Sequence, residues 1–544
     1  MPIFEIDGKK ITAEQGTTVL EAARANGIEI PHFCYHESFQ SGGLCRMCLV
    51  EIEKMPKLQT SCTTVVTEGM VVKTTTERVK EARKAILEFI LTNHPLDCPD
   101  CDQAGECVLQ DYTHKYGPDK SSFIEPKELR NHIELSEHIA YDPERCIMCE
   151  RCVRYYREIV GTEELAVMYR GTSSEITTFP GKQLTYGYIG NIADICPVGA
   201  LTTRDFRFKE RVFNLRTTET ICPLCEAGCP IYVDAKMFTV YRVRSRNPKI
   251  TTIHTHPNRD VAAVYPDPLV NAILRSGFIC DDGRFNYKKM IQGIVIDEPV
   301  NRIEPKKNAW NELLGFVAEK IKENGHGVSG IISTYATNEE AYAFMHLLKY
   351  TGASSIGIIN FPEAKEFGRD KQNLKLRKGV QAPNVRGVKE IANWYGIKLI
   401  GIEDVLKSKP GLIYILGPVF DQLDKYGDAV AAMPFVIVED FKSSEWMGKV
   451  HVILPGVNFA QKDGTYTNKD GMVQRLKKAV NEPKHSMNDL DILNSIVYNI
   501  MGKGLGSFDQ VLKTMVDTIP FFKDVKAEEL SKELYLKKAA GRLW

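Results

Sequence analysis

Hydrophobic and polar residues alternate in short runs at the start of the chain. The segments IFEI (3–6) and KKIT (9–12) show a period of two, and the Asp7-Gly8 pair between them is a strong signal for a hairpin turn. The following segment, TTVLEAARANG (17–27), places its apolar residues at helical spacing between a threonine cap and a glycine stop. With two more strands predicted at CLVEIE and MVVKTT, residues 1–78 are expected to form a small β-rich domain.

A helical period replaces the alternation between residues 77 and 94. The apolar residues that share one face of this predicted helix are Val79, Ala82, Ile86, Phe89 and Ile90. His94 follows Ile90 by four positions, and Pro95 ends the helix. The pattern therefore predicts a histidine on the buried face of a helix, at its last residue.

The pattern changes again near residue 291. Helical segments (WNELLGFVAEKIKEN and NEEAYAFMHLLKYTG) are each followed by a short apolar run (GVSGIIS and SIGIIN), and three more such runs follow, GLIYILG, FVIVED and HVILPG. This succession predicts an α/β domain with a largely parallel sheet. Residues 251–271 are expected to form a long loop, and the tail from about residue 505 to be helical and charged.

Length, charge and hydropathy limit the classes of protein that need to be considered. The chain has 544 residues, enough for about three or four domains at about 150 residues each. Lys+Arg and Asp+Glu both number 70, so net charge offers no argument for a nucleic-acid or acidic-membrane partner. No apolar run reaches the roughly 18 residues of a membrane span, and the start lacks the features of a signal peptide. We expect a cytoplasmic chain that reaches the inner face of the membrane only through a partner.

The cysteines change this picture, because there are fifteen of them and all lie at or before Cys280. In a cytosolic chain that number favours metal binding over disulfides. The first group is Cys34, Cys45, Cys48 and Cys62. One C-x2-C pair with two flanking single cysteines in a β-rich domain is typical of a [2Fe–2S] ferredoxin, and Gly42 and Gly43 would let the backbone approach the sulfurs. A zinc site is the alternative, although zinc sites usually pair two C-x2-C knuckles.

The second group is one cysteine short of a four-iron cluster. It contains only Cys98, Cys101 and Cys107, and His94 stands three residues before the first of them. A neutral imidazole can take the fourth position and removes one negative charge relative to a thiolate, an exchange that raises the potential in Rieske centres. A satisfied core histidine is the alternative interpretation of His94, but its place beside three cysteines favours a ligand.

Two further groups have the spacing of [4Fe–4S] sites. Cys146, Cys149 and Cys152, with Cys196 in CPVGAL, follow the C-x2-C-x2-C plus Cys-Pro pattern of [4Fe–4S] ferredoxins. Cys222, Cys225 and Cys229 form a C-x2-C-x3-C group, for which Cys280 is the remaining cysteine. The four groups need sixteen ligands, and fifteen cysteines plus His94 supply that number. The sequence therefore predicts one [2Fe–2S] and three [4Fe–4S] clusters.

The order of these motifs resembles the large iron–sulfur subunit of respiratory complex I, NADH:quinone oxidoreductase. The resemblance rests on the four cysteine groups, whose motifs include HPLDCPDCDQAGEC and FICDDGRF. Beyond Cys280 it rests on the segments STYATNEEAYAF, QAPNVRGV and DGTYTNKDGMVQR. It implies a multidomain α+β and α/β protein: a β-grasp [2Fe–2S] ferredoxin domain (1–78), a helical His/Cys cluster segment (79–136), a [4Fe–4S] ferredoxin-like domain (137–212), a fourth cluster segment (213–290), and a molybdopterin-oxidoreductase-like α/β domain (291–544). The chain is shorter than most bacterial relatives, so the last domain is expected to be truncated, and no molybdenum is expected in it.

The same resemblance implies a role and partners. The chain would relay electrons from a flavin/NADH-binding subunit and its small [2Fe–2S] partner toward the quinone-side hydrophilic subunits. In the family the fourth cluster lies off the main path and occurs in only some members. No Walker or Rossmann fingerprint is present, so we expect this chain to bind neither NADH nor FMN and to have no acid–base catalytic residue.

Three other functions compete with this one. An [FeFe]-hydrogenase needs four more cysteines than the chain offers. The relay subunit of a soluble NAD(P)-linked [NiFe]-hydrogenase or formate dehydrogenase complex uses similar modules and stays open. A zinc-stabilised scaffold would be colourless. The basic runs RDFRFKER (204–211) and YRVRSRNPK (241–249) are expected to be solvated faces or subunit contacts rather than binding sites.

Overall fold

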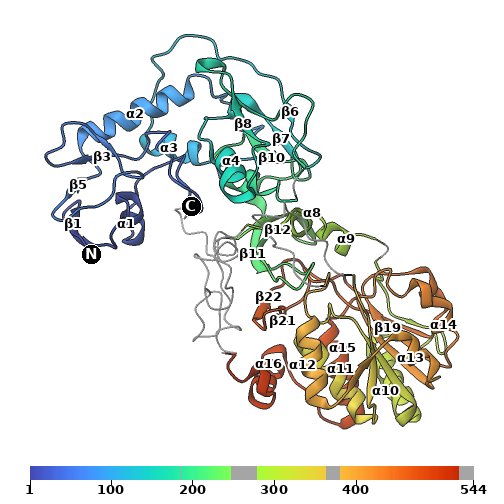
Figure 1. The fold of residues 1–544 in the computed structure, drawn as a ribbon. Helices are drawn as coiled ribbons and strands as arrows, with labels where there is room; N and C mark the ends of the chain where they lie inside the picture. Colours follow the sequence, from blue (N-terminus) through green and yellow to red (C-terminus); the bar gives the residue numbers. More distant parts are fainter. Residues whose placement is uncertain (186, 247–277, 294, 363–379, 526–544) are drawn as a thin grey trace. The chain divides into compact units, whose positions relative to one another are not determined.

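The computed structural model describes residues 1–185, 187–246, 278–293, 295–362 and 380–525 (Figure 1). The chain divides into two compact units, Met1–Leu215 and Arg216–Trp544. The loop expected at 251–271 and the end of the tail, 526–544, lie outside the described residues. No helix in the described ranges is both long and apolar enough to cross a membrane.

The N-terminal sheet confirms the strands expected from the alternating pattern. Its strands, in the order in which they lie, are β2 (Lys9–Thr12), β1 (Ile3–Ile6), β5 (Val71–Lys73), β3 (Leu49–Ile52) and β4 (Gln59–Thr60). Asp7 and Gly8 both have positive φ between β1 and β2, as a two-residue hairpin requires. Helix α1 (Val19–Ala25) begins at Thr18, whose side chain forms a reciprocal capping box with Glu21. This sheet and helix enclose the core from which the first cysteine loop emerges.

Helix α2 (Glu77–Leu91) corrects two details of the expected helix 77–94. Its buried residues are Val79, Arg83 and Leu87, while Phe89 is 74% exposed and stands edge-to-face with Phe123. The buried stripe therefore runs at steps of four from Val79, which turns Phe89 to the outside. The helix ends at Leu91, so His94 lies three residues beyond it rather than at its last position, and the Lys127 ammonium donates to the terminal carbonyls of Leu91 and Thr92.

The rest of the first unit is made of short elements. Helix α3 (Val108–Tyr116) follows the second cysteine group, and helix α5 (Asn191–Ile195) ends at Cys196. A three-stranded sheet has the order β10 (Leu201–Thr203), β7 (Ile139–Tyr141) and β6 (Ile133–Glu134), and β8 (Ala166–Met168) pairs with β9 (Glu175–Thr177). Helix α4 (Arg151–Arg154) passes directly into a π-helical turn, Tyr155–Val160. Such turns concentrate at functional sites.

The second unit begins with a three-stranded antiparallel meander. Its strands are β11 (Arg216–Ile221), β12 (Pro230–Lys236) and β13 (Thr239–Ser245), and the fourth cysteine group lies between the first two. Two short helices follow, α8 (Asp281–Phe285) and α9 (Tyr287–Ile291). Cys280 is the residue that precedes α8, and its thiol accepts a hydrogen bond from the Gly283 amide at 3.4 Å.

A seven-stranded sheet confirms the α/β domain. Its order is β14 (Val300–Asn301), β20 (Val452–Pro455), β19 (Val436–Asp440), β18 (Leu412–Leu416), β15 (Val328–Ile332), β16 (Ser355–Ile358) and β17 (Lys398–Ile400). Every pair is parallel except β14 with β20.

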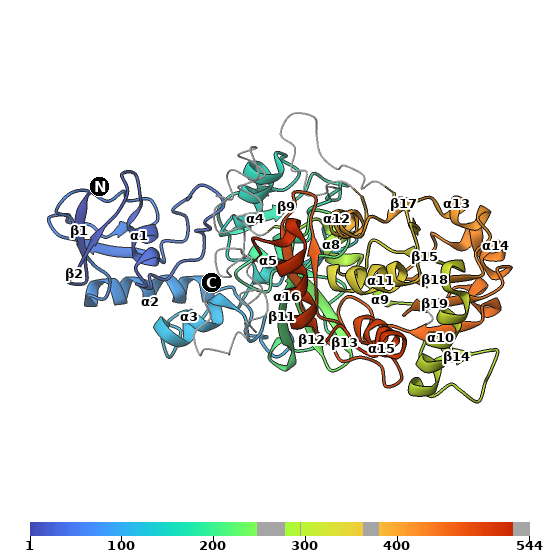
Figure 2. The ribbon, with the colours of Figure 1, turned by 90° about the horizontal axis from the view of Figure 1, so that it is seen from below.

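Helices cover both faces of this sheet (Figures 1 and 2). One core cluster joins the sheet to α10 (Trp310–Asn324), α11 (Asn338–Tyr350), α12 (Val385–Tyr395), α15 (Asp489–Met501) and α16 (Phe508–Thr518). The other joins it to α13 (Ile402–Lys407) and α14 (Gly427–Ala431). Burial on both faces explains why these strands are continuous apolar runs rather than alternating ones.

A buried ionic cluster fastens this domain together. The Lys462 ammonium, 2% exposed, lies 2.8 Å from the Glu340 carboxylate on α11 and 3.3 Å from the Asp489 carboxylate at the start of α15. Lys462 shortly precedes the hairpin of β21 (Gly464–Thr467) and β22 (Val473–Leu476), whose Thr465 donates to Glu339. One buried cation thus connects two helices and a hairpin that are far apart in sequence.

Candidate metal centres

The first cysteine group closes into one site. Cys34, Cys48 and Cys62 are each 1% exposed, and the amides of Phe33 and Cys34 donate to the Cys45 sulfur at 3.4 Å. Hydrogen bonds from the thiols of Cys45 and Cys62 lower the pKa of Cys34, and Cys62 also bonds Cys48. The four sulfurs predicted as one ligand set are therefore joined by successive contacts in the order Cys45, Cys34, Cys62 and Cys48.

Backbone amides also point at these sulfurs, although they are not those of the two glycines named from the sequence. The amides of Leu44 and Cys45 bond the Cys34 sulfur. Gly43 adopts positive φ directly before them, a conformation that glycine adopts at little cost. The glycine turn thus presents the amides of the next two residues, which stabilise negative charge on sulfur.

The second group forms a compact turn before α3. The Cys101 amide donates to the carbonyls of Asp97 and Cys98, and the charges of Cys101 and Cys98 both act on the Cys107 thiol. Burial raises the pKa of Cys107 to about 12. A thiol in this state stays protonated unless a metal displaces the proton, as iron would on binding.

His94 is neutral and partly buried, which suits a histidine that binds a metal. Its Nδ1 is buried and has no hydrogen-bond partner within the described part of the chain. Burial lowers the pKa of the imidazole to about 4, so the ring is neutral at physiological pH, as a metal ligand must be. Asp97 and Arg145 influence both His94 and Cys101. These shared neighbours place His94 beside the turn that carries the three cysteines.

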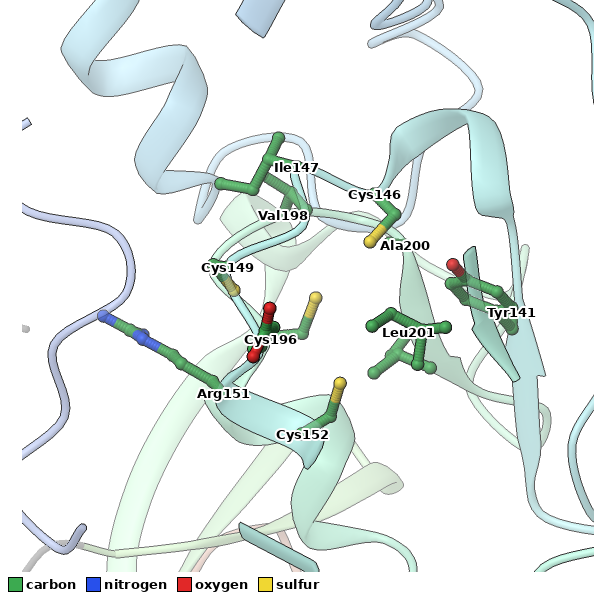
Figure 3. Close-up of a pocket in the computed structure, with 12 residues that line it drawn as sticks. Tyr141, Cys146, Ile147, Cys149, Arg151, Cys152, Cys196, Val198, Ala200 and Leu201 are labelled. Atoms are coloured by element: carbon green, nitrogen blue, oxygen red, sulfur yellow. The ribbon is translucent and has the colours of Figure 1, made fainter. Parts of the chain in front are cut away.

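The third group lines a pocket into which its four sulfurs point (Figure 3). Cys146, Cys149, Cys152 and Cys196 share this space with the apolar side chains of Ile147, Ile176, Val198, Ala200 and Leu201 and with Tyr141. Met148 and Glu150 adopt positive φ, which lets three cysteines within seven residues turn toward one point. Burial raises the pKa of Cys146, Cys149 and Cys196 to about 11. Apart from the sulfurs, Tyr141, Glu150 and Arg151, the lining of the pocket is apolar, which suits a buried cluster.

The fourth group includes Cys280 in space. The Cys222 amide donates to the Cys229 carbonyl at 2.8 Å, which closes the C-x2-C-x3-C loop. A methyl group on Gly283 would lie 3.2 Å from the Cys222 sulfur and 3.6 Å from the Cys280 sulfur. The charges of Cys225, Cys222 and Cys280 all act on the Cys229 thiol. The structure thus brings together four cysteines that span 59 positions of sequence.

The sulfur sets fit a multi-iron group better than a single ion. Within the part of the chain that the structure describes, no three His, Cys, Asp or Glu side chains are placed to hold one metal ion. A cubane takes one ligand at each of four iron atoms, so its ligands stand farther apart than those of a single ion. The fit therefore rests on the shared pocket, the direction of the sulfurs and the soft thiolate donors that iron–sulfur clusters use.

The third group lies between the first and the second. Arg151, which precedes Cys152, donates to the Tyr35 carbonyl beside Cys34 at 2.7 Å. On the other side, the Val108 amide next to Cys107 donates to the Pro197 carbonyl next to Cys196 at 3.0 Å. In space the three sets of the first unit therefore follow the order first, third, second, which differs from their order in sequence.

Gly199, three residues after Cys196 of the third set, packs against Cys101 of the second set, and this contact can be tested. A methyl group at this position would lie 2.2 Å from the Cys101 sulfur. We expect Gly199→Ala to push that sulfur out of place and to empty the second set, which iron analysis would detect as a loss of about four iron atoms. Gly315→Ala is the matched control, because nothing lies within 4 Å of its methyl position. Full iron in Gly199→Ala would show that Cys101 is not a ligand.

Arginines near these sets make ion pairs and hydrogen bonds within the fold. Arg207 pairs with Asp142 at 2.9 Å, and Arg211 donates to the Cys101 carbonyl, both from the run 204–211. In the run 241–249, Arg242 and Arg244 pair with the buried Asp234. These side chains are therefore not part of a freely solvated face, and the interpretation of the runs as subunit contacts stays a prediction. Asp142 is distant in sequence from Arg207, whereas Asp234 meets Arg242 and Arg244 across the β12–β13 hairpin, and charge counting along the chain reveals neither pairing.

Family models match four segments of the chain. They are a 2Fe-2S iron-sulfur cluster binding domain (residues 3–77), an NADH-ubiquinone oxidoreductase-G iron-sulfur binding region (83–122), an NADH-quinone oxidoreductase subunit 3 ferredoxin-like domain (136–202) and a molybdopterin oxidoreductase domain (379–498). The expected fold, three iron–sulfur modules followed by a molybdopterin-oxidoreductase-like α/β domain, is confirmed.

Curated complex I subunits are similar to about two thirds of this chain. The mitochondrial NADH dehydrogenase [ubiquinone] iron-sulfur protein 1 of Solanum tuberosum is 36% identical over 354 residues, 64% of this chain and 45% of that protein. The NADH-ubiquinone oxidoreductase 75 kDa subunit of Reclinomonas americana is 35% identical over 377 residues, 68% of this chain and 51% of that protein. The match thus spans about half the length of these relatives. A crystal structure of NAD+-reducing [NiFe]-hydrogenase in the H2-reduced state matches 39% of this chain and 91% of its own, with 30% identity and a TM-score of 0.36.

Proposed function

We propose that this chain belongs to the family of the large iron–sulfur subunit of complex I, which its family models and relatives resemble, and that it is the electron-transfer subunit of an NADH:quinone oxidoreductase. It takes electrons from a flavin-bearing, NADH-oxidising subunit and its small [2Fe–2S] partner, and it passes them to quinone-side hydrophilic subunits. The complex holds the chain at the inner face of the cell membrane. The observation that carries the proposal is the contact of the third cysteine set with both the first and the second in one compact unit.

The proposed ligands are the four sets named from the sequence. They are Cys34, Cys45, Cys48 and Cys62 for a [2Fe–2S] cluster, and for three [4Fe–4S] clusters His94 with Cys98, Cys101 and Cys107, then Cys146, Cys149, Cys152 and Cys196, then Cys222, Cys225, Cys229 and Cys280. When bound, these clusters supply one-electron transfer. No molybdenum belongs to the proposal.

The chain's own residues prepare these sites for that role. Burial of Cys34, Cys48, Cys152 and Cys196 keeps water from the sulfurs, and a low dielectric strengthens the effect of every nearby charge. Amides of Leu44 and Cys45 stabilise thiolate charge on Cys34. Neutral His94 contributes one negative charge fewer than a thiolate would, which raises the potential at the second set.

Anaerobic reduction by NADH tests the function directly. The chain alone, with NADH, should keep its oxidised visible spectrum. Addition of the flavin-bearing partner should bleach that spectrum within the mixing time. Bleaching by NADH without any partner would contradict the proposal, and so would a chain that stays oxidised in the assembled complex. Reduction by hydrogen in a complex that leaves quinone untouched would favour the hydrogenase relay instead.

The role of His94 gives a further prediction. His94→Ala should lose about four iron atoms, whereas His94→Cys should keep them and lower the potential of that cluster, because a thiolate adds negative charge. His114→Ala, at an exposed position of α3, serves as the control. Iron analysis and a redox titration followed by electron paramagnetic resonance would measure both effects. Full iron and an unchanged spectrum in His94→Ala would mean that His94 is only a core histidine.

A further inference from the structure

Two arginines on α4 join the first and third cysteine sets. Arg151 donates to the Tyr35 carbonyl at 2.7 Å and to the Ile195 carbonyl at 3.2 Å. Tyr35 follows Cys34, and Ile195 precedes Cys196. Figure 3 shows the Arg151 side chain extending away from the four sulfurs of the third set, toward an N-terminal, blue segment of the ribbon.

Arg154 makes a parallel connection one turn later. Its guanidinium donates to the carbonyls of Cys34, Gln40 (2.7 Å) and Cys149 (3.2 Å). The side chain is 3% exposed and its charged end lies over the Phe39 ring, 5.1 Å from the centroid. Each arginine therefore bonds the backbone beside a ligand of both sets.

Carbonyl oxygens and the two cysteine sets, rather than carboxylates, surround the charges of these two arginines. All their hydrogen bonds in the described structure go to carbonyl oxygens, and neither has a carboxylate within salt-bridge range there. The strongest charge neighbours of Arg151 are Cys149, Cys45 and Cys34. A cation out of water costs several kcal/mol unless an anion compensates it. The thiolates of the two sets are the anions that can do so.

Arg145 shows the contrasting arrangement in the same unit. It also lies beside cysteine ligands, but it pairs with Asp97 and, at 2.8 Å, with Asp142. These two carboxylates offset part of the Arg145 charge, which also acts on the Cys101 thiol. Without such carboxylates, the positive charges of Arg151 and Arg154 act mainly on the two cysteine sets between which they lie.

We propose that Arg151 and Arg154 are positioning residues that tie the first and third cluster sites together and raise the reduction potentials of both. The inference deepens the proposed function, on which it rests. Reduction adds one negative charge to a cluster, and a nearby cation that no carboxylate neutralises stabilises that charge. Because one pair of cations serves two sites, it keeps both potentials high enough to accept electrons in succession.

Redox titrations of the full-length chain test this, with electron paramagnetic resonance reporting each cluster separately and dithionite with mediators as reductant. Arg151→Met and Arg154→Met should each lower the reduced-to-oxidised ratio of the first and third clusters about tenfold at a fixed ambient potential, which is 59 mV for one electron. Arg151→Lys keeps the charge and should keep the potentials. Arg157→Met is the matched control, because Arg157 lies on the next turn but is 57% exposed and pairs with Glu158.

The outcomes distinguish an effect of the arginine charge on the potentials from a purely structural role of the side chains. If Arg151→Met and Arg154→Met hold full iron and their midpoints equal those of Arg157→Met, the proposal is wrong. If the methionine variants lose iron, Arg151→Lys decides: full iron with wild-type midpoints supports the proposal, and loss of iron or shifted midpoints overturns it. A wild-type chain without clusters would instead show that the proposed function fails, before any variant is compared.

Discussion

Replacing Cys152 with alanine should stop electrons from passing between the first and second cysteine sets, whereas replacing Cys280 with alanine should leave that passage intact. Both changes remove one sulfur from a four-ligand set, so each should lower the iron content by about four atoms. Cys152 belongs to the set that contacts both its neighbours in the first unit. Cys280 belongs to a set that lies wholly in the second unit.

NADH-driven quinone reduction by the assembled complex measures the difference. The Cys152→Ala complex should lose activity by at least an order of magnitude, and the Cys280→Ala complex should keep most of it. Equal losses in the two variants would place the fourth set on the path. Undiminished activity in Cys152→Ala would remove the third set from it.

Lys462→Met should destabilise the second unit by about 3–5 kcal/mol, because it leaves buried Glu340 and Asp489 without their cation. Glu340 is 1% exposed and Asp489 4%, so water cannot replace the lost partner. Chemical denaturation followed by tryptophan fluorescence should report the change, since Trp310 and Trp446 lie in this unit.

The control for this change is Lys449→Met, which removes an equivalent charge at the surface. Lys449 pairs with Asp428 at 2.7 Å, but both side chains are largely exposed. Its loss should leave the free energy of unfolding almost unchanged, because water and salt screen an exposed ion pair. A similar small effect for Lys462→Met would mean that the buried carboxyls are protonated and need no cation.

Local signals carried most of what the sequence could predict. Asp7-Gly8 specified a hairpin by its turn chemistry alone, and Thr18 with Glu21 specified the start of a helix. The close cysteine spacings predicted each group, because residues a few positions apart on one loop can turn their sulfurs toward one point. Even Cys280 could be assigned, because it was the remaining cysteine.

Long-range packing set the rest. Phe89 lies on the outside because the tertiary contacts of α2 centre on Val79 and Leu87, which no helical period specifies to within one position. The place of the third set between the first and second depends on Arg151 and Pro197, whose partners are distant in sequence. Arg207 was interpreted as a surface charge for the same reason, since its partner Asp142 is 65 positions away in sequence.

The metal content of the anaerobically purified chain tests the central claim most directly. One [2Fe–2S] and three [4Fe–4S] clusters predict about 14 iron atoms per chain, with neither molybdenum nor zinc. About 10 iron atoms would mean that one cubane set is empty. Molybdenum near one atom per chain would contradict the relay and favour a catalytic oxidoreductase, and zinc without iron would contradict the account as a whole.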